Sequence, residues 1–301
     1  MISALRAPSP ALVLAFAVLL GSAMDATIKH LGQSNDVLLV ALGRYVFGAL
    51  FSLPPYLHAG RPKITADMLR IHGLRGAMIA CGGTGFFWAF TVLPLAEAIA
   101  YSFVGLLIIP IAASLMIGER LRSSSIAAGL MGFAGVLVAA QGGPSAGASP
   151  HHALGIVVVL ISATLFALSM VLMRARAGRD GAPIVGLLSS AIPAMFLAGP
   201  ALAFSSPPHW ADWPVFLLMG AFAAGFLFFM SKAYARAEAQ QLAPIHYTEF
   251  IWAGAFGYFI FAELPRPQLL LGAILIIAAG LYAAWDERRL SRQARTLKVD
   301  A

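Results

Sequence analysis

Ten apolar stretches of helix length follow one another along the chain. A bilayer with a hydrocarbon core about 30 Å thick is crossed by roughly 20 residues of α-helix, which is the length of these stretches. Hydrophobic residues make up 60% of the sequence and charged residues only 11%, so a soluble domain could not bury the apolar surface. The sequence therefore predicts an all-α membrane protein with ten transmembrane helices. The expected spans are Ala11–Ile28, Val37–Tyr56, Leu74–Val92, Ala96–Ile117, Ser124–Ala140, Ala153–Met173, Pro183–Phe204, Pro214–Ala233, Leu242–Phe261 and Leu269–Trp285.

The basic residues are sorted between alternate loops. With a cytoplasmic N-terminus, every Lys and Arg except Lys29, Arg44 and Arg266 lies in or beside a cytoplasmic loop or tail. By the positive-inside rule both termini are then cytoplasmic, and we expect a multi-pass protein of the cell (inner) membrane. The formal charge of +7 follows from this topology, so the charge does not require a nucleic-acid partner.

The N-terminal apolar stretch and the cysteine content narrow the class of protein further. The stretch Ala11–Gly21 after Arg6 has the form of a signal peptide, but it continues apolar to Ile28 and nine further spans follow it. We therefore expect an uncleaved first helix. The single cysteine, Cys81, excludes an internal disulfide and a cysteine metal site.

The chain contains an internal repeat. Residues 95–140 align with residues 239–284 at an offset of 144, rising to 145 after one gap, which pairs Glu119 with Glu263 and Gly135 with Gly280. Because each repeat has five spans, an odd number, the second copy must enter the membrane inverted. The predicted organisation is a first five-helix repeat at 1–141, a linker at 142–152, a second repeat at 153–285 and a basic cytoplasmic tail at 286–301.

In its ten spans, its internal repeat and the residues named below, the sequence resembles the drug/metabolite transporter superfamily, in particular proteins built from two EamA-type five-helix units. The resemblance covers nearly the whole chain, 11–285. It implies a secondary transporter in which helices 1–4 and 6–9 enclose a central cavity while helices 5 and 10 lie outside, and it is nearest to the branch with riboflavin and S-adenosylmethionine carriers. The residues that carry it are Asp25, Lys29, Arg44, Pro110, Gly118, Glu119, Leu121, Pro244, Tyr247, Glu263, Pro265, Gly272 and Gly280.

Ionisable residues within the spans are candidates for function, because each is costly to place in hydrocarbon. Asp25 and Lys29 are four residues apart, so they share a face of helix 1 and can form an ion pair. Arg44 is as far from the turn between helices 1 and 2 as Asp25 is, which places the two at similar depth. These three residues form an expected outer polar cluster, either a structural salt bridge or a gate or substrate clamp.

The ninth span carries the leading candidate for a substrate or proton site. His246 and Glu249 are three residues apart and therefore lie on one face, with Tyr247 beside them and Trp252 a turn further on. Glu249 is expected about 10 Å inside the cytoplasmic boundary. There it can exchange a proton through His246 or bind substrate, or it can simply bond to a neighbouring helix. No further His or Cys clusters with this pair, so we predict no metal site.

Aromatic side chains offer a second lining for the implied cavity. Trp88 in helix 3 and Tyr101 in helix 4 would suit a planar or amphipathic metabolite by stacking. Glu119 and Glu263 stand at span boundaries and are expected to cap or anchor helix ends. Pro110 is expected to interrupt helix 4 and so provide a hinge.

The sequence as a whole predicts a secondary active transporter that moves a small organic metabolite by alternating access. The substrate classes are an amino acid, a nucleotide-like or vitamin-like compound, or a drug. An intramembrane enzyme acting on a lipid or amphipathic substrate is the alternative, but no DDxxD, HExxH or GxSxG motif supports it. No P-loop is present, so the driving force would be an ion or substrate gradient. We expect no cofactor, and as partners the substrate, membrane lipids, a coupling proton and at most a second copy of the chain, as a monomer or homodimer.

Overall fold

The computed structural model describes residues 9–118, 123–140, 149–234, 245–279, 281, 282 and 285, and the regular structure of these residues is helical. Six of the described helices are long and apolar enough to cross a bilayer, and two shorter apolar helices cover Gly129–Ala139 and Pro267–Ala279. The chain is therefore an all-helical membrane protein. Its helices are α1 (Pro10–Leu31), α2 (Val37–His58), α3 (Ala66–Val92), α4 (Leu95–Ser102), α5 (Val104–Ile117), α6 (Ser123–Ala140), α7 (His152–Asp180), α8 (Ala182–Phe204), α9 (Trp213–Tyr234) and α11 (Thr248–Phe261), with a 3-10 turn η1 (Trp210–Asp212) before α9.

Two helices extend well beyond the apolar spans that the sequence predicts. The hydroxyl of Thr65 accepts a hydrogen bond from the backbone N–H of Met68 and so caps α3 eight residues before the expected start of that span. At its other end α7 continues past Met173 to Asp180. These extensions carry polar residues beyond the apolar segments, where they can meet one another.

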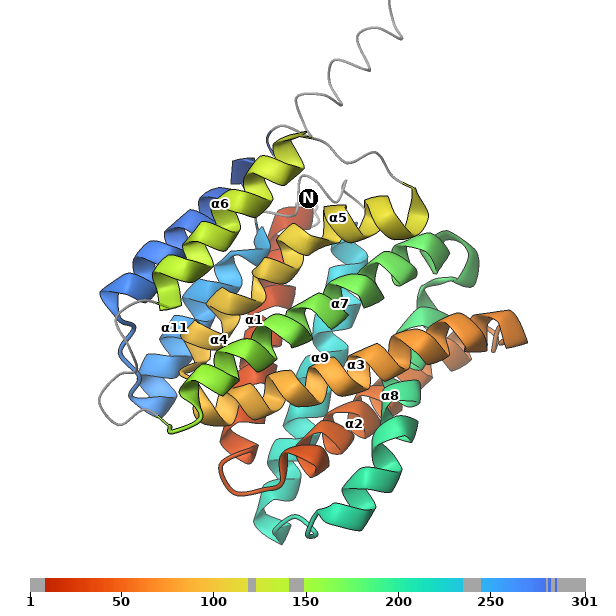
Figure 1. Cartoon of the computed structure of the whole chain (residues 1–301). Helices are drawn as coiled ribbons and strands as arrows, with labels where there is room; N and C mark the ends of the chain where they lie inside the picture. The colour runs from red at the N-terminus through yellow and green to blue at the C-terminus, as the bar shows by residue number, and fades with distance from the viewer. Residues whose placement is uncertain are drawn as a thin grey trace, which may run out of the picture.

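Helices that are distant in sequence pack against one another (Figure 1). The most extensive contacts join α1 to α9, α2 to α8 and α3 to α7, followed by α2 with α9, α5 with α7 and α3 with α8. Helix α11 packs on α1 and α4, whereas α5 packs on α6 and α7. Helix α6 lies beside the 267–279 helix, and the approach is so close that a Cβ on Gly135 would stand 2.9 Å from the carbonyl oxygen of Gly272.

The fourth predicted span is broken, but not by its proline. Helix α4 ends at Ser102 and α5 begins at Val104, while Pro110 lies inside α5. The expectation that Pro110 interrupts the helix is therefore wrong. At the break the hydroxyl of Ser102 donates to the carbonyl of Ile99, and the N–H of Leu106 bonds three residues back to Phe103.

A second break of the same form precedes α11. Residues 245 and 246 are helical, Tyr247 forms a turn, and the N–H of Phe250 bonds to the carbonyl of Tyr247. Both α5 and α11 then end in a left-handed residue, Gly118 with φ 70° and Ala262 with φ 55°. An alanine in this conformation brings its Cβ close to its own backbone, so the second cap is strained where the first is not.

We expect Ala262→Gly to raise the free energy of unfolding by about 1 kcal/mol, because glycine removes the Cβ from the left-handed cap. The matched change Gly118→Ala should lower it by a similar amount. Thermal unfolding of the purified protein in detergent measures both. A lower melting temperature for Ala262→Gly would contradict the assignment of strain to this cap.

Candidate functional site

Three ionisable side chains from different helices form a group in which the first lies within electrostatic range of the other two. They are Asp25 on α1, Arg44 on α2 and Glu249 at the start of α11. Asp25 is only 6% exposed, and Arg44 and Glu249 are half-buried. In the described part of the chain, no hydrogen bond and no ion pair within 4.0 Å joins either carboxyl group to another residue. We call these three residues the central cluster.

Several buried polar atoms near the central cluster also lack a hydrogen-bond partner among the described residues. The Nε atom of Arg44 is buried without an acceptor, and its guanidinium lies 4.5 Å from the centroid of the adjacent Tyr45 ring. Ser190 on α8 lies close to Arg44, next to Gly48. A Cβ placed on Gly48 would be 3.2 Å from the Ser190 hydroxyl and 3.9 Å from an Arg44 nitrogen. The Ser190 hydroxyl and that of Ser22, one turn from Asp25 on α1, are likewise buried without a partner.

The aromatic candidates on the ninth span divide between two surroundings. The ring of Tyr247 packs edge-on against Phe103 with centroids 5.3 Å apart, so the two helix breaks touch each other. Trp252 packs against the buried apolar group at the start of α1 that includes Leu14. His246 lies half-buried at the break, next to Tyr247.

Lys29 does not pair with Asp25, so this part of the expected outer cluster is wrong. The Lys29 ammonium lies 2.7 Å from Glu263 and also donates to the carbonyls of Phe90 and Leu93, at 2.9 and 2.6 Å. The other oxygen of Glu263 accepts from the N–H of Leu95 at 2.8 Å, which caps the start of α4. The anchoring role expected for Glu263 is confirmed, and the same role for Glu119 falls outside the described residues.

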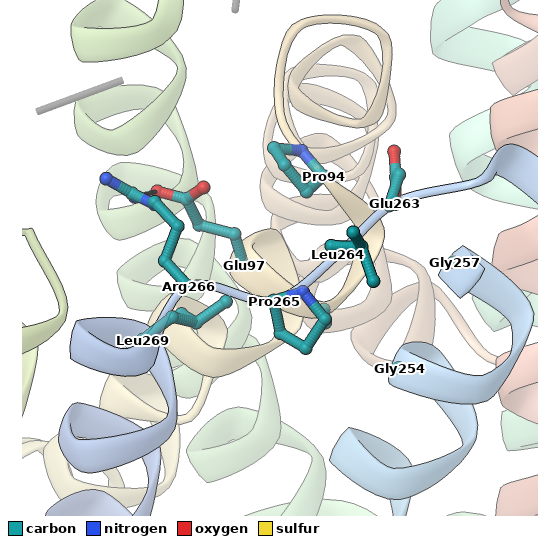
Figure 2. A pocket seen from close by; sticks show the side chains of 10 residues that line it. Pro94, Glu97, Gly254, Gly257, Glu263, Leu264, Pro265, Arg266 and Leu269 are labelled. Atoms are coloured by element: carbon teal, nitrogen blue, oxygen red, sulfur yellow. Dashed lines mark hydrogen bonds and ion pairs between the residues drawn. The ribbon is translucent and has the colours of Figure 1, made fainter. Parts of the chain in front are cut away.

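A second acid, Glu97, has three partners at the same end of the bundle, and Figure 2 shows one of them, Arg266. One oxygen of Glu97 lies 2.7 Å from Arg266, 3.1 Å from the Nε2 atom of His152 and 3.2 Å from the hydroxyl of Tyr101. The Glu97 side chain is 1% exposed. We call this end, formed by residues 32–36, 93–94 and 262–266, the Glu97 face. A pocket opens there, lined by Pro94, Ala96, Glu97, Gly254, Gly257, Glu263, Leu264, Pro265, Arg266 and Leu269.

Two of the predicted lining residues belong to this face. The Tyr101 hydroxyl is used by Glu97, and the ring of Trp88 lies 6.5 Å from that of His151 at the start of α7. Neither has a described contact with the central cluster. Glu97 is not among the candidates predicted from the sequence, although an acid inside the apolar span 96–117 is a signal that identifies such a residue.

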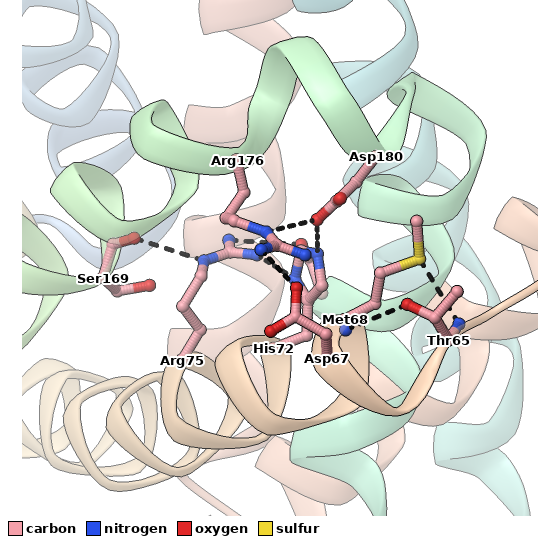
Figure 3. A network of polar contacts seen from close by, with 9 residues as sticks. Thr65, Asp67, Met68, His72, Arg75, Ser169, Arg176 and Asp180 are labelled. Carbon is pink, nitrogen blue, oxygen red and sulfur yellow. Dashed lines mark hydrogen bonds and ion pairs between the residues drawn. The ribbon is translucent and has the colours of Figure 1, made fainter.

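The opposite end, formed by residues 59–65 and Gly181, carries a chain of polar contacts that is buried except at Asp67. We call it the Asp180 network (Figure 3). The Nε2 atom of His72 lies 3.0 Å from Asp180, and Arg75 lies 2.9 Å from the Nδ1 atom of His72. Arg176 contacts Asp180 at 3.2 Å and Asp67 at 2.6 Å. The network therefore joins α3 to α7.

The neighbours of His72 determine its protonation. Arg75 can only donate, so Nδ1 of His72 is the acceptor and Nε2 carries the proton that is donated to Asp180. Burial lowers the pKa of His72, and the Arg75 charge lowers it further against the opposing effect of Asp180. Burial acts to raise the pKa of Asp180, but hydrogen bonds from Arg176 and His72 leave it lowered. The folded protein therefore holds a neutral histidine against an ionised aspartate.

Comparison with known families gives the same match twice. The chain matches the EamA-like transporter family over residues 8–141 and again over residues 153–284. A solved crystal structure superposes with a TM-score of 0.64, at 21% identity over 92% of this chain and 99% of that chain. At that identity the likeness concerns the fold alone.

The alignments with curated relatives cover most of this chain and most of each relative. The S-adenosylmethionine uptake transporter of Rickettsia prowazekii (strain Madrid E) is 24% identical over 88% of this chain and 88% of its own length. The riboflavin transporter of Brucella anthropi is 25% identical over 91% and 97%, and the pseudopaline exporter CntI of Pseudomonas aeruginosa is 23% identical over 86% and 89%. All three are named as transporters of small molecules.

We expect the melting temperature of the protein to fall as the pH is lowered from about 6.5 to 5. In that window an unfolded His72 takes up a proton while the folded one, with its lowered pKa, does not, so stability is lost on acidification. The change His72→Gln keeps an amide donor for Asp180 and should reduce this slope. The exposed His209→Gln is the control and should keep it. Equal slopes in His72→Gln and the parent protein would contradict the assignment.

Proposed function

The chain belongs to the EamA-like transporter family, and on that premise we propose that it is a secondary active transporter that carries a small organic metabolite by alternating access. The family and the relatives point to a transporter and not to the intramembrane enzyme considered from sequence. The observation that carries the proposal is the central cluster. A buried aspartate with Glu249 and Arg44 in range, and without a hydrogen bond or ion pair to the described residues, is the arrangement expected of a substrate or coupling-ion site.

We propose further that the two family matches are inverted five-helix repeats. A two-fold axis would exchange α1 with α7, α2 with α8, α3 with α9 and the α4–α5 helix with α11. Under this exchange the packing of α1 on α9 becomes that of α7 on α3. The packing of α2 on α9 becomes that of α8 on α3, while the contacts of α2 with α8 and α4 with α11 map onto themselves. Phe103 and Tyr247 are 144 residues apart, the offset of the repeat, and their contact supports a two-fold axis near the helix breaks.

The packing indicates that each moving body contains helices of both repeats, because α1 packs extensively on α9 and α3 on α7. Helices α1, α2, α9 and α11 form one group, the α9 bundle, and helices α3, α4, α5, α7 and α8 form the other, the α7 bundle. The strongest contacts between the bundles are those of α2 with α8 and α4 with α11. We therefore propose that the α9 bundle rocks against the α7 bundle, in place of one repeat against the other.

Orientation follows the distribution of basic residues, with both termini cytoplasmic and the Glu97 face outside in an inner membrane. In this state α4 packs on α11. Two residues that follow α11 bind α4, because Glu263 accepts from the N–H of Leu95 and Arg266 lies 2.7 Å from Glu97, so these contacts join the bundles at that face. These contacts support a conformation closed to the outside, which must break them to admit substrate.

Uptake of labelled S-adenosylmethionine and labelled riboflavin into proteoliposomes tests the proposed function. A transporter accumulates the label as the unaltered compound under an imposed gradient, whereas an enzyme changes it chemically. Absence of gradient-dependent uptake or exchange of either compound would count against a carrier of the kind its relatives are named for.

Cross-linking the Glu97 face should arrest transport, because that face joins the two bundles. In a Cys81→Ser background, which has no cysteine, a bifunctional thiol reagent can link Pro94→Cys to Leu264→Cys, two residues that line the same pocket. The control pair is Asn35→Cys with Asp212→Cys, whose side chains hydrogen-bond within the α9 bundle. Transport that survives the first link, or stops equally with the second, would contradict the mixed bundles.

We expect Glu249→Gln to weaken transport by about tenfold or more and to flatten its pH dependence, because the amide can neither release a proton nor offer a charge. Glu249→Asp keeps a carboxyl group and should keep the pH dependence. Initial rates of uptake between pH 5 and 8 measure both. Unchanged transport at every pH would remove Glu249 from the mechanism.

A further inference from the structure

We propose that the central cluster selects a zwitterionic substrate, one that carries an ammonium or other cationic group together with a carboxylate. The cationic group would lie between Asp25 and Glu249, and the carboxylate would bind Arg44. This inference rests on the proposed function and names the substrate class of the same site.

The first support is the charge left over at the acidic end of the cluster. Asp25 and Glu249 are two carboxyl groups in range of each other, and among the described basic residues it is Arg44 that acts on Asp25, at longer range. Lys29, one turn along α1, would be the natural partner of Asp25, but Glu263 and two backbone carbonyls use all of its donors. A cation that comes with the substrate is the missing partner, because two buried carboxyl groups repel each other and attract a positive group.

The second support is the unused donor capacity at Arg44. Its Nε–H is buried without an acceptor, and the described residues provide no carboxylate within 4.0 Å of its guanidinium. The planar guanidinium fits a carboxylate through two parallel hydrogen bonds, which makes arginine the side chain suited to bind that group. The Ser190 hydroxyl, also without a partner, comes from α8 on the facing bundle and can complete the contact when the bundles close.

These two halves predict discrimination among chemically related compounds. S-adenosylmethionine carries an ammonium, a sulfonium and a carboxylate. Its decarboxylated form lacks only the carboxylate. 5′-Methylthioadenosine keeps the adenosine but lacks the carboxylate, the ammonium and the positive charge on sulfur. Riboflavin is uncharged at neutral pH. The three adenosyl compounds hold the adenosine constant while first the carboxylate and then both positive charges are removed.

The test measures binding by thermal shift and by isothermal titration on the full-length protein, for the four compounds and for lysine and methionine as smaller zwitterions. The unmodified protein should bind at least one zwitterion about tenfold more tightly than 5′-methylthioadenosine or riboflavin. Asp25→Asn should weaken binding of both charged adenosyl compounds about tenfold. Arg44→Gln should weaken S-adenosylmethionine about tenfold and leave its decarboxylated form unchanged, so the preference for the carboxylate disappears.

Two results of the binding measurements would overturn the inference. One is tighter binding of riboflavin or 5′-methylthioadenosine than of every zwitterion, and the other is an equal loss for all ligands in both variants. The melting temperature without ligand shows whether each variant is folded, and Asp25→Glu, which keeps the charge, gives a second reading if Asp25→Asn is not. The proteoliposome assay separates the two proposals. Transport of riboflavin alone would support the proposed function and contradict the zwitterionic substrate. Transport of none of the compounds would contradict the proposed function itself.

Discussion

A charged side chain in hydrocarbon must find a partner, and the architecture follows how this chain meets that requirement. Near the two ends of the bundle, the charged side chains find their partners within the protein. Glu263 holds Lys29 and the first turn of α4, and Glu97 holds Arg266 and Tyr101. At the other end Asp180 holds His72 and Arg176. Among the described residues, Asp25 and Glu249 are carboxyl groups without a direct contact, and this is where the proposed substrate would bind.

The positions of the helices could be predicted from the sequence, because a run of about 20 apolar residues has few alternatives to a membrane helix. The contacts of the charges could not. Lys29 satisfies the four-residue rule with Asp25, yet it turns to Glu263, more than 200 residues away, where two carbonyls at the end of α3 complete its coordination. Glu97 and Arg266 likewise meet only because α4 packs on α11. Such partners are set by tertiary packing, which local spacing does not encode.

The helix breaks show a local rule overruled in the same way. Proline removes one hydrogen bond and predicts an interruption at Pro110, but the helix continues through it. The break falls at Phe103, beside Gly105, whose α-carbon packs so closely on α7 that a Cβ would stand 3.0 Å from the carbonyl of Ala163. The contact of Phe103 with Tyr247 then joins the two broken helices at one point. Where the chain bends is thus decided by what the neighbouring helix allows.

The proposed two-fold symmetry of the helices, combined with a central cluster that does not obey it, has a mechanical consequence. Asp25, Arg44 and Glu249 all stand on the α9 bundle, while the repeat partner of Glu249 is Gly105, pressed against α7 and without room for a side chain. Substrate held by these three charges would therefore travel with the α9 bundle. The α7 bundle supplies the facing surface, including Ser190, and its contact with bound substrate depends on closure. A ligand bound only by one bundle favours neither end state until the other bundle completes the contacts, so the selectivity of closure would be set by the uncharged face.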